Sequence, residues 1–175
     1  MPVTFGKPLF TKSEIQKRVQ ELGEKISEDY KGKDLILVGV MKGAFVFLAD
    51  LARNIRLPIV VDYLGLSSFD SRSKGRGAVR ISSDLNMNIA GKHVLVVEDI
   101  INSGLTMEYV TKSLKARDPK GIKVCTLLDK VEKRRTNFKA DYVGFTIPDR
   151  YVVGYGLDYQ DQYRNLPYIA SITEE

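Results

Sequence analysis

The spacing of apolar residues near the start of the chain predicts an amphipathic helix. Thr11 is followed three residues later by Glu14, the spacing of a capping box, and a glycine at position 32 ends the pattern. Between them, apolar residues recur every three or four positions: Ile15, Val19, Leu22, Ile26 and Tyr30. Residues at this spacing lie on one face of a helix, so we expect that face to pack on a core.

Beyond this helix, short apolar runs alternate with helical patterns. The runs are nearly continuous, as in strands covered on both faces, and they occupy residues 34–41, 59–66, 93–99 and 122–129. Helical patterns occupy residues 44–55 and 106–118. The alternation predicts an α/β domain with a mostly parallel sheet and right-handed crossovers. In such sheets ligands bind beyond the carboxyl ends of the strands.

Two segments lack a regular period. Residues 67–80, SSFDSRSKGRGAVR, are polar, basic and glycine-bearing, which indicates a mobile loop or an open hairpin. After Arg135 the chain is irregular, and we expect short strands and loops that form a cap. We therefore expect residues 1–175 to form a single domain.

Composition narrows the class of protein without choosing a function. The chain has 175 residues, of which 43% are hydrophobic and 28% charged, as in an ordinary globular domain. Its single cysteine, Cys125, lies in the apolar run VCTLL, which excludes an intramolecular disulfide and indicates a packing role in a reducing compartment. The net charge of +5 permits nucleic acid, a membrane surface or a phosphorylated metabolite as partner.

The N-terminal segment and the lengths of the apolar runs indicate where in the cell the protein is expected. The segment MPVTFGKPLF has no long apolar region and no cleavage site, and no apolar run approaches the roughly 20 residues that span a bilayer. We expect a soluble, cytoplasmic protein without a membrane partner.

Candidate chemistry gathers in the stretch VEDIINSGLT. Residues 102–106 lie between a strand and a helix, where free backbone N–H groups and the helix dipole favour a phosphate, and Ser103 and Thr106 add hydroxyl donors. Alone, this loop could equally be a turn with a Ser or Thr cap. Glu98 and Asp99, at the exit of a buried strand, favour the ligand because buried acids need partners such as sugar hydroxyls or Mg²⁺. Phosphate and diol together indicate a ribose phosphate.

The same stretch closely resembles the phosphoribosyl-diphosphate signature of the type I phosphoribosyltransferases. Over nearly its full length the chain resembles the members of that family that act on hypoxanthine and guanine. MKGAF resembles their pyrophosphate loop, SSFDS their flexible catalytic loop, LLDK their purine-contacting strand end, and YVVGYGLDYQDQYR their C-terminal base and metal segment. The resemblance implies a mostly parallel five-stranded sheet flanked by helices, a catalytic loop at about 66–80, and a small hood from the chain termini that includes about 150–175.

The resemblance also implies roles for individual residues. Phosphoribosyl diphosphate would be bound by Lys42, Gly43, Glu98, Asp99, Asn102, Ser103, Gly104, Leu105, Thr106 and Arg164. The purine would be bound by Lys130, Tyr151, Val152 and Asp158, and Mg²⁺ as cofactor by Glu98, Asp99 and Asp158. It further implies a cis peptide bond between Met41 and Lys42. Without the resemblance, Lys130 and Arg164 would be solvated charges, Tyr151 and Val152 core residues, and Asp158 a helix N-cap.

The implied reaction replaces pyrophosphate at C1 of phosphoribosyl diphosphate with a nitrogen of a 6-oxopurine, which gives a nucleoside monophosphate. Ser68 and Phe69 would act in the catalytic loop, but the family usually has Ser-Tyr there, so a hydroxyl contact is lost. At the position of Asn102 the family usually has an aspartate, assigned as the general base that takes the proton from purine N7. An amide cannot accept that proton at neutral pH.

Three hypotheses follow from this departure. The chain is a purine phosphoribosyltransferase with a slowed or rerouted proton transfer, or the same enzyme with an engineered aspartate-to-asparagine change, or a regulator that binds phosphoribosyl diphosphate and nucleic acid. The regulator would use its basic surface, and the basic residues Arg72, Lys74, Arg76 and Arg80 could be a weak nucleic-acid patch or only a solvated loop. Retention of the full purine and pyrophosphate set favours the enzyme, so nucleic acid is not the expected partner. The family forms homodimers or homotetramers, and the preference among hypoxanthine, guanine and xanthine is left open.

Overall fold

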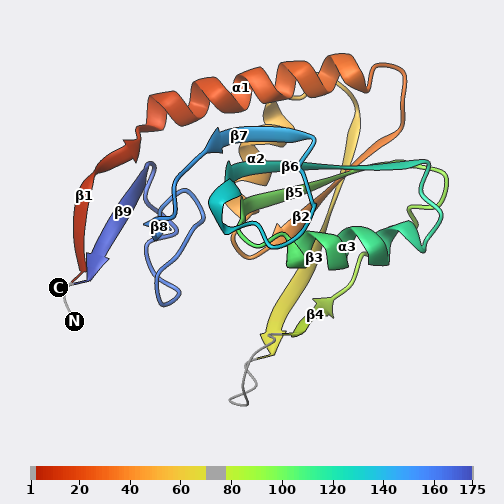
Figure 1. Cartoon of the computed structure of the whole chain (residues 1–175). Helices are drawn as coiled ribbons and strands as arrows, with labels where there is room; N and C mark the ends of the chain where they lie inside the picture. Colours follow the sequence, from red (N-terminus) through yellow and green to blue (C-terminus); the bar gives the residue numbers. More distant parts are fainter. Residues whose placement is uncertain (1–2, 70–77, 175) are drawn as a thin grey trace.

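In a computed structural model that describes residues 3–69 and 78–174, two sheets and three α-helices make up the fold (Figure 1). The larger sheet contains β2 (Leu35–Met41), β3 (Ile59–Phe69), β4 (Ala78–Ser83), β5 (His93–Ile101), β6 (Gly121–Asp129) and β7 (Tyr142–Thr146). The smaller contains β1 (Val3–Phe10), β8 (Val152–Val153) and β9 (Ile169–Glu174). The helices are α1 (Lys12–Asp29), α2 (Phe45–Asn54) and α3 (Leu105–Lys115), with a 3₁₀ turn η1 (Val131–Lys133).

The larger sheet has the order β4-β3-β2-β5-β6-β7. All its pairs are parallel except β3 with β4, so the expected five-stranded parallel sheet is confirmed and gains one antiparallel edge strand. This strand, β4, begins within residues 67–80, the segment expected to be a loop or an open hairpin. The two ends of that segment pair with each other as the arms of a hairpin do. Residues 70–77, which include three of the four basic residues named above, lie outside the described part of the chain.

Apolar cores lie on both faces of the larger sheet. The stripe on α1 is buried against α2 and the sheet as expected, and the helix begins with the predicted capping box between Thr11 and Glu14. The other core is formed with the buried face of α3. Cys125 is fully buried in the first core, which confirms its packing role, and burial raises the pKa of its thiol. Within residues 3–69 and 78–174, no helix is long and apolar enough to cross a bilayer.

The smaller sheet, with order β1-β9-β8, is the hood expected from the chain termini. The apolar pattern did not predict β1 or β9. Gly6 and Pro8 interrupt β1, and the register of its pairing with β9 shifts on both sides of Pro8. Proline and glycine weaken a strand pattern, so β1 is defined by its partner rather than by its own sequence. The hood joins the rest of the chain beside the carboxyl end of the larger sheet (Figure 1).

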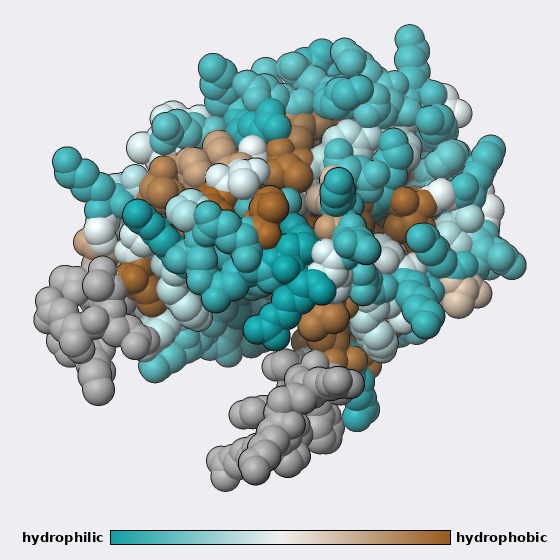
Figure 2. All heavy atoms as spheres, viewed as in Figure 1, coloured by the Kyte–Doolittle hydropathy of each residue, from teal (hydrophilic) through white to brown (hydrophobic). Residues whose placement is uncertain are grey.

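The surface seen in Figure 2 is largely hydrophilic. Hydrophobic side chains interrupt it near the middle of this face and beside the ends of β3 and β4. Scattered exposed apolar residues are normal on a soluble protein.

Candidate active site

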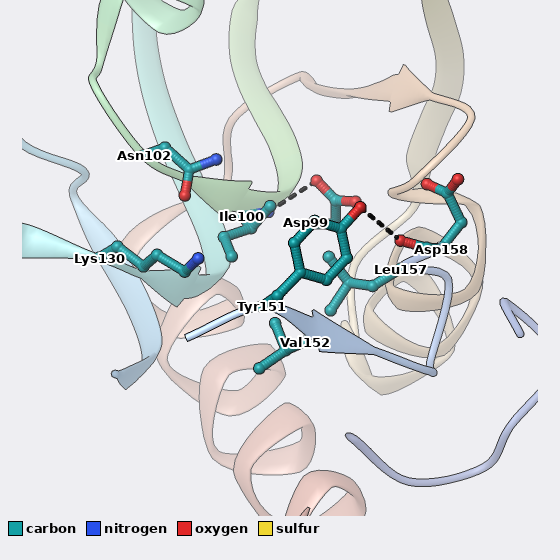
Figure 3. A pocket seen from close by; sticks show the side chains of 8 residues that line it. All are labelled: Asp99, Ile100, Asn102, Lys130, Tyr151, Val152, Leu157 and Asp158. Carbon is teal, nitrogen blue, oxygen red and sulfur yellow. Dashed lines mark hydrogen bonds between the residues drawn. The ribbon is translucent and has the colours of Figure 1, made fainter. Parts of the chain in front are cut away.

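A cavity of about 190 Å³ lies beyond the carboxyl ends of β5 and β6, beside β8. It is lined by Asp99, Ile100, Asn102, Lys130, Tyr151, Val152, Leu157 and Asp158 (Figure 3). The location agrees with the expectation for a parallel sheet. Of the lining residues, only Ile100 and Leu157 were not predicted, because apolar side chains beside buried strands resemble core residues in a sequence.

The loop between β5 and α3 is arranged to accept an anion. Gly104 has a φ of 86°, in the left-handed region, and immediately precedes the first residue of α3. The backbone N–H groups of Ser103, Gly104 and Thr106 donate to no acceptor among the described residues, whereas the Ser103 hydroxyl accepts from Leu105 N at 3.3 Å. The Ser103 hydroxyl therefore forms a local turn, not a helix cap, and the three amides remain free within residues 3–69 and 78–174. Free amides at a helix N-terminus form a site suited to phosphate.

Glu98 and Asp99 occupy the exit of β5, as predicted. Glu98 is only 7% exposed, and its Oε1 accepts from Asp99 N at 3.0 Å. Asp99 Oδ1 accepts from Ile100 N at 2.7 Å. Burial, together with the neighbouring Asp99 carboxylate, raises the pKa of Glu98 well above its usual range, and burial also raises the pKa of Asp99. Ionising both carboxyl groups is therefore unfavourable, because they are buried next to each other. A cation or a hydroxyl donor that reaches them would offset this cost.

We expect Glu98→Gln to raise stability at neutral pH in the absence of ligand. Because the folded-state pKa of Glu98 lies above its unfolded-state pKa, the folded protein binds more protons and loses stability as pH rises through that interval. The side chain introduced by Glu98→Gln does not titrate, so this loss of stability disappears. We expect Tm to rise by roughly 2–4 °C for each kcal/mol gained in the free energy of unfolding. Urea unfolding between pH 4 and pH 8 measures the effect, which should shrink as pH falls.

Glu28→Gln is the matched control, since Glu28 is exposed on α1 and has no ion pair among the described residues. It should leave stability nearly unchanged across the same pH range. A Glu98→Gln protein less stable than the wild type at pH 8 would contradict the prediction.

The loop after β2 lies directly against the acids of β5. The peptide bond between Met41 and Lys42 is cis, as the resemblance implied. A Cβ at Gly43 would stand 1.8 Å from Asp99 Oδ2, and a Cβ at Gly156 would stand 2.2 Å from the Gly43 carbonyl oxygen. Only glycine therefore fits at position 43 without a shift of Asp99.

The predicted pyrophosphate contacts of this loop are its amides and its lysine. In the described part of the chain, the N–H groups of Lys42 and Gly43 donate to no acceptor. The Lys42 ammonium lies 3.1 Å from Asp161, and both side chains are exposed. The amides are thus free for a ligand, while the ammonium has an exchangeable surface partner.

The predicted purine-binding residues face one another across the cavity (Figure 3). Lys130 is only 8% exposed, burial lowers the pKa of its ammonium, and its Nζ lies 3.7 Å from Asp149. Tyr151 is 54% exposed, so it is not a core residue, and its hydroxyl donates to Asp158 O at 3.3 Å. Val152 is buried beneath it in β8. A flat ligand could lie on the Tyr151 ring within reach of Lys130.

Arg164 organises the segment that follows the hood strand β8. Its guanidinium lies 3.0 Å from both Asp158 and Asp161 and donates to Gly156 O at 2.8 Å. Asp158 also accepts from Asp161 N at 2.8 Å, in a turn rather than at a helix N-cap. Arg164 is therefore an ordered donor group close to Gly43, since Gly156 touches both.

The predicted metal ligands are not gathered into one cluster. Among the described residues, no three His, Cys, Asp or Glu side chains are placed to hold a metal ion together. Mg²⁺ commonly takes one or two carboxylates and completes its shell with waters and phosphate oxygens. Asp99, which has no ion-pair partner in the described ranges, fits that donor chemistry together with Glu98.

Two further predicted residues cannot be placed in the site. Ser68 and Phe69 end β3, where their backbones pair with Val79 and Ala78 of β4. Their side chains fall outside the described residues, so their catalytic roles stay predictions.

The chain matches a family model described as "Phosphoribosyl transferase domain" over residues 9–160. It is 45% identical over 166 residues to a hypoxanthine phosphoribosyltransferase of Escherichia coli strain K12, covering 94% of this chain and 93% of that protein. A crystal structure of a hypoxanthine-guanine phosphoribosyltransferase from Bacillus anthracis is 42% identical with a TM-score of 0.92, covering 99% of this chain and 100% of that one. Another structure is the asparagine mutant from an analysis of an invariant aspartic acid in HPRTs; it is 41% identical with a TM-score of 0.91, covering 97% and 93%.

Proposed function

Because the chain belongs to the type I phosphoribosyltransferase family, we propose that it transfers the 5-phosphoribosyl group of phosphoribosyl diphosphate to hypoxanthine, guanine or both. The products are IMP or GMP and pyrophosphate, and the role is purine salvage. The observation that carries the proposal is one cavity in which Asp99 of β5 and Asn102, at the start of the loop after β5, meet Lys130 and Tyr151.

The purine lies against the exposed Tyr151 ring, because stacking uses only the face of the base. The Lys130 ammonium has donors and no acceptor, so it binds a 6-oxo group and disfavours a 6-amino group. Val152 backbone groups and Asp158 complete the base site. Burial of Lys130 strengthens this discrimination, since an unmatched donor would be left without water.

The ribose phosphate extends from the base toward the loop after β5. The amides of Ser103, Gly104 and Thr106 hold the 5′-phosphate, with the Ser103 and Thr106 hydroxyls and the Leu105 amide as neighbours. Glu98 and Asp99 accept from the ribose hydroxyls. These contacts hold C1 of the sugar near the reacting nitrogen of the purine, and such positioning accelerates transfer.

Negative charge grows on pyrophosphate as it leaves. In this proposal the amides of Lys42 and Gly43 and the guanidinium of Arg164 bind those oxygens; the absence of an acceptor for the two amides among the described residues supports this role. Preorganised donors lower the barrier most where charge develops. Glu98, Asp99 or Asp158 would hold Mg²⁺, which would neutralise part of the charge on the leaving group. Closure by the loop that carries Ser68 and Phe69 excludes water from the reactive sugar.

Asn102 lines the cavity where the family has its general base. Its amide orients the purine by hydrogen bonding, and water takes the proton instead. We therefore propose a working but slow enzyme. The alternative of a nucleic-acid-binding regulator has no support, since the relatives named above are phosphoribosyltransferases.

The assembly is a homo-oligomer, a dimer or a tetramer, and the protein works in the cytoplasm. Val61 and Tyr63 support the first point, because both are exposed and, two positions apart in β3, lie on the same face of the sheet. Exposed apolar residues gathered on one surface are typical of an interface. Light scattering of the purified protein determines the oligomeric state.

Initial rates with phosphoribosyl diphosphate, Mg²⁺ and each of hypoxanthine, guanine, xanthine and adenine test the proposal. We expect transfer to hypoxanthine or guanine, and at least a 100-fold lower rate with adenine. Lys130→Met should lower kcat/KM for the favoured base by roughly 10²-fold. Lys133→Met is the control: it pairs with the same Asp149 from an exposed position and should change the rates little. Equal rates with adenine, or no transfer together with tight RNA binding, would refute the proposal.

A further inference from the structure

Two carbonyl groups of the phosphate loop, residues 102–106, accept hydrogen bonds from one later segment of the chain: those of Asn102 and Ser103. Arg134 Nη1 donates to Asn102 O at 3.2 Å, Arg135 N donates to Ser103 O at 2.9 Å, and the Thr136 hydroxyl donates to Ser103 O at 3.4 Å. A peptide group whose carbonyl is fixed on one side presents its N–H on the other. Residues 134–136 therefore help determine which way the amides of Ser103 and Gly104 face.

Arg134 is the only one of these donors that is both charged and a side chain. Its guanidinium also pairs with Asp129, and the two side chains are 12% and 9% exposed. Asp129 ends β6, directly before Lys130, whereas Asn102 follows β5. The buried pair thus links the ends of two neighbouring strands through a single rigid group.

The loop after β5 packs closely against the Arg134 side chain. A Cβ at Gly104 would stand 2.4 Å from Thr136 Oγ1 and 3.0 Å from Arg134 Cδ, so the left-handed glycine lies against both side chains. A planar guanidinium can donate to Asp129 and to the Asn102 carbonyl at once, which a lysine ammonium on a flexible stem does less well. The contact therefore selects arginine.

We propose that Arg134 is a positioning residue for the 5′-phosphate site: paired with Asp129, it holds the Asn102 carbonyl and thereby fixes the direction of the Ser103 amide in the same peptide group. The inference rests on the proposed function, since it assigns this loop to the sugar phosphate. Arg134 makes no hydrogen bond or ion pair with Lys42, Gly43 or Arg164 among the described residues, so the pyrophosphate site should not depend on it.

Calorimetric titration with ribose 5-phosphate and, separately, with pyrophosphate at constant Mg²⁺ tests the proposal. Loss of a charged donor should raise the Kd of Arg134→Met for ribose 5-phosphate about tenfold or more, with less than a twofold change for pyrophosphate. Arg134→Lys should recover part of the affinity. Arg135→Met is the charge-matched control, because the Arg135 side chain is exposed and only its backbone touches the loop, and it should bind both ligands as the wild type does.

Arg134→Met leaves the Asp129 carboxylate buried without its partner, which can impair folding. The double variant Asp129→Asn/Arg134→Met removes both charges and should show the same selective loss for ribose 5-phosphate. Equal losses for both ligands, or no loss for ribose 5-phosphate, would refute the positioning role of Arg134 and leave the proposed function standing. A wild-type protein that binds ribose 5-phosphate but transfers no phosphoribosyl group would refute the proposed function only. A wild-type protein that does not bind ribose 5-phosphate would refute both the proposed function and the role of Arg134.

Discussion

Asn102→Asp should raise kcat with hypoxanthine or guanine at least tenfold. Asn102 faces the cavity that Lys130 and Tyr151 enter, so a carboxylate there can take the proton that the amide cannot (Figure 3). A positioned acid-base group contributes typically on the order of 10²- to 10⁴-fold. Steady-state rates at saturating phosphoribosyl diphosphate and Mg²⁺ measure the gain. KM for phosphoribosyl diphosphate should change less than kcat, because the loop amides are unaltered.

Asn137→Asp is the matched control for this change. It makes the same replacement at an exposed position in the neighbouring segment, so it adds the same charge without reaching the cavity. Its kcat should equal that of the wild type. Equal rates for the Asn102→Asp and wild-type proteins would show that position 102 does not limit proton transfer.

Gly43→Ala should lower kcat/KM for phosphoribosyl diphosphate by at least 100-fold. The new Cβ would stand 1.8 Å from Asp99 Oδ2, and Asp99 is held by a 2.7 Å hydrogen bond from Ile100 N. Either the carboxylate or the amides of the pyrophosphate loop must move. Misplacement of a reacting group by about 1 Å can cost 10²-fold, and loss of one oxyanion donor 10²- to 10³-fold. Initial rates across a range of phosphoribosyl diphosphate concentrations measure the loss.

Gly121→Ala is the control for an added methyl group. A Cβ there would meet His93 Nδ1 at 3.5 Å, which is an ordinary contact. Gly121 is the first residue of β6, at the opposite end of the strand from the cavity. Activity and Tm should stay close to the wild type. A Gly43→Ala protein that keeps more than a tenth of wild-type kcat/KM would contradict the argument, and a Tm lowered in parallel would assign the loss to folding instead.

The larger sheet could be predicted because each central strand is covered on both faces and must be apolar throughout. Residues 94–97 of β5, for example, are all fully buried. The hood strands β1 and β9 could not be predicted, because Gly6 and Pro8 interrupt β1 and the two strands pair across the whole length of the chain. Strand pairing over such a separation leaves no periodic signal in either partner.

The candidate site could be predicted where its residues are contiguous. The stretch from Glu98 to Thr106 carries its own chemistry, and the structure has the loop after β5 as expected. The partners of that loop could not be predicted, because Arg134 lies in a run of charged residues that resembles a solvated surface. The burial that perturbs the pKa of Glu98 likewise depends on the packed sheet and not on neighbours in sequence.

The division of the site between two sheets bears on how the protein can be altered. Tyr151 and Val152 come from the hood and its edge, whereas the phosphate and pyrophosphate loops follow strands of the larger sheet. Under the proposed function, stacking of the base therefore lies in a separate structural module from the sugar chemistry, whereas the contact of Lys130 with the 6-oxo group comes from the end of β6 in the larger sheet. Laboratory evolution toward unnatural purines should accumulate its substitutions in residues 149–153, while Gly43, Gly104 and Gly156 stay invariant because backbone or neighbouring side chains fill the space of their missing side chains.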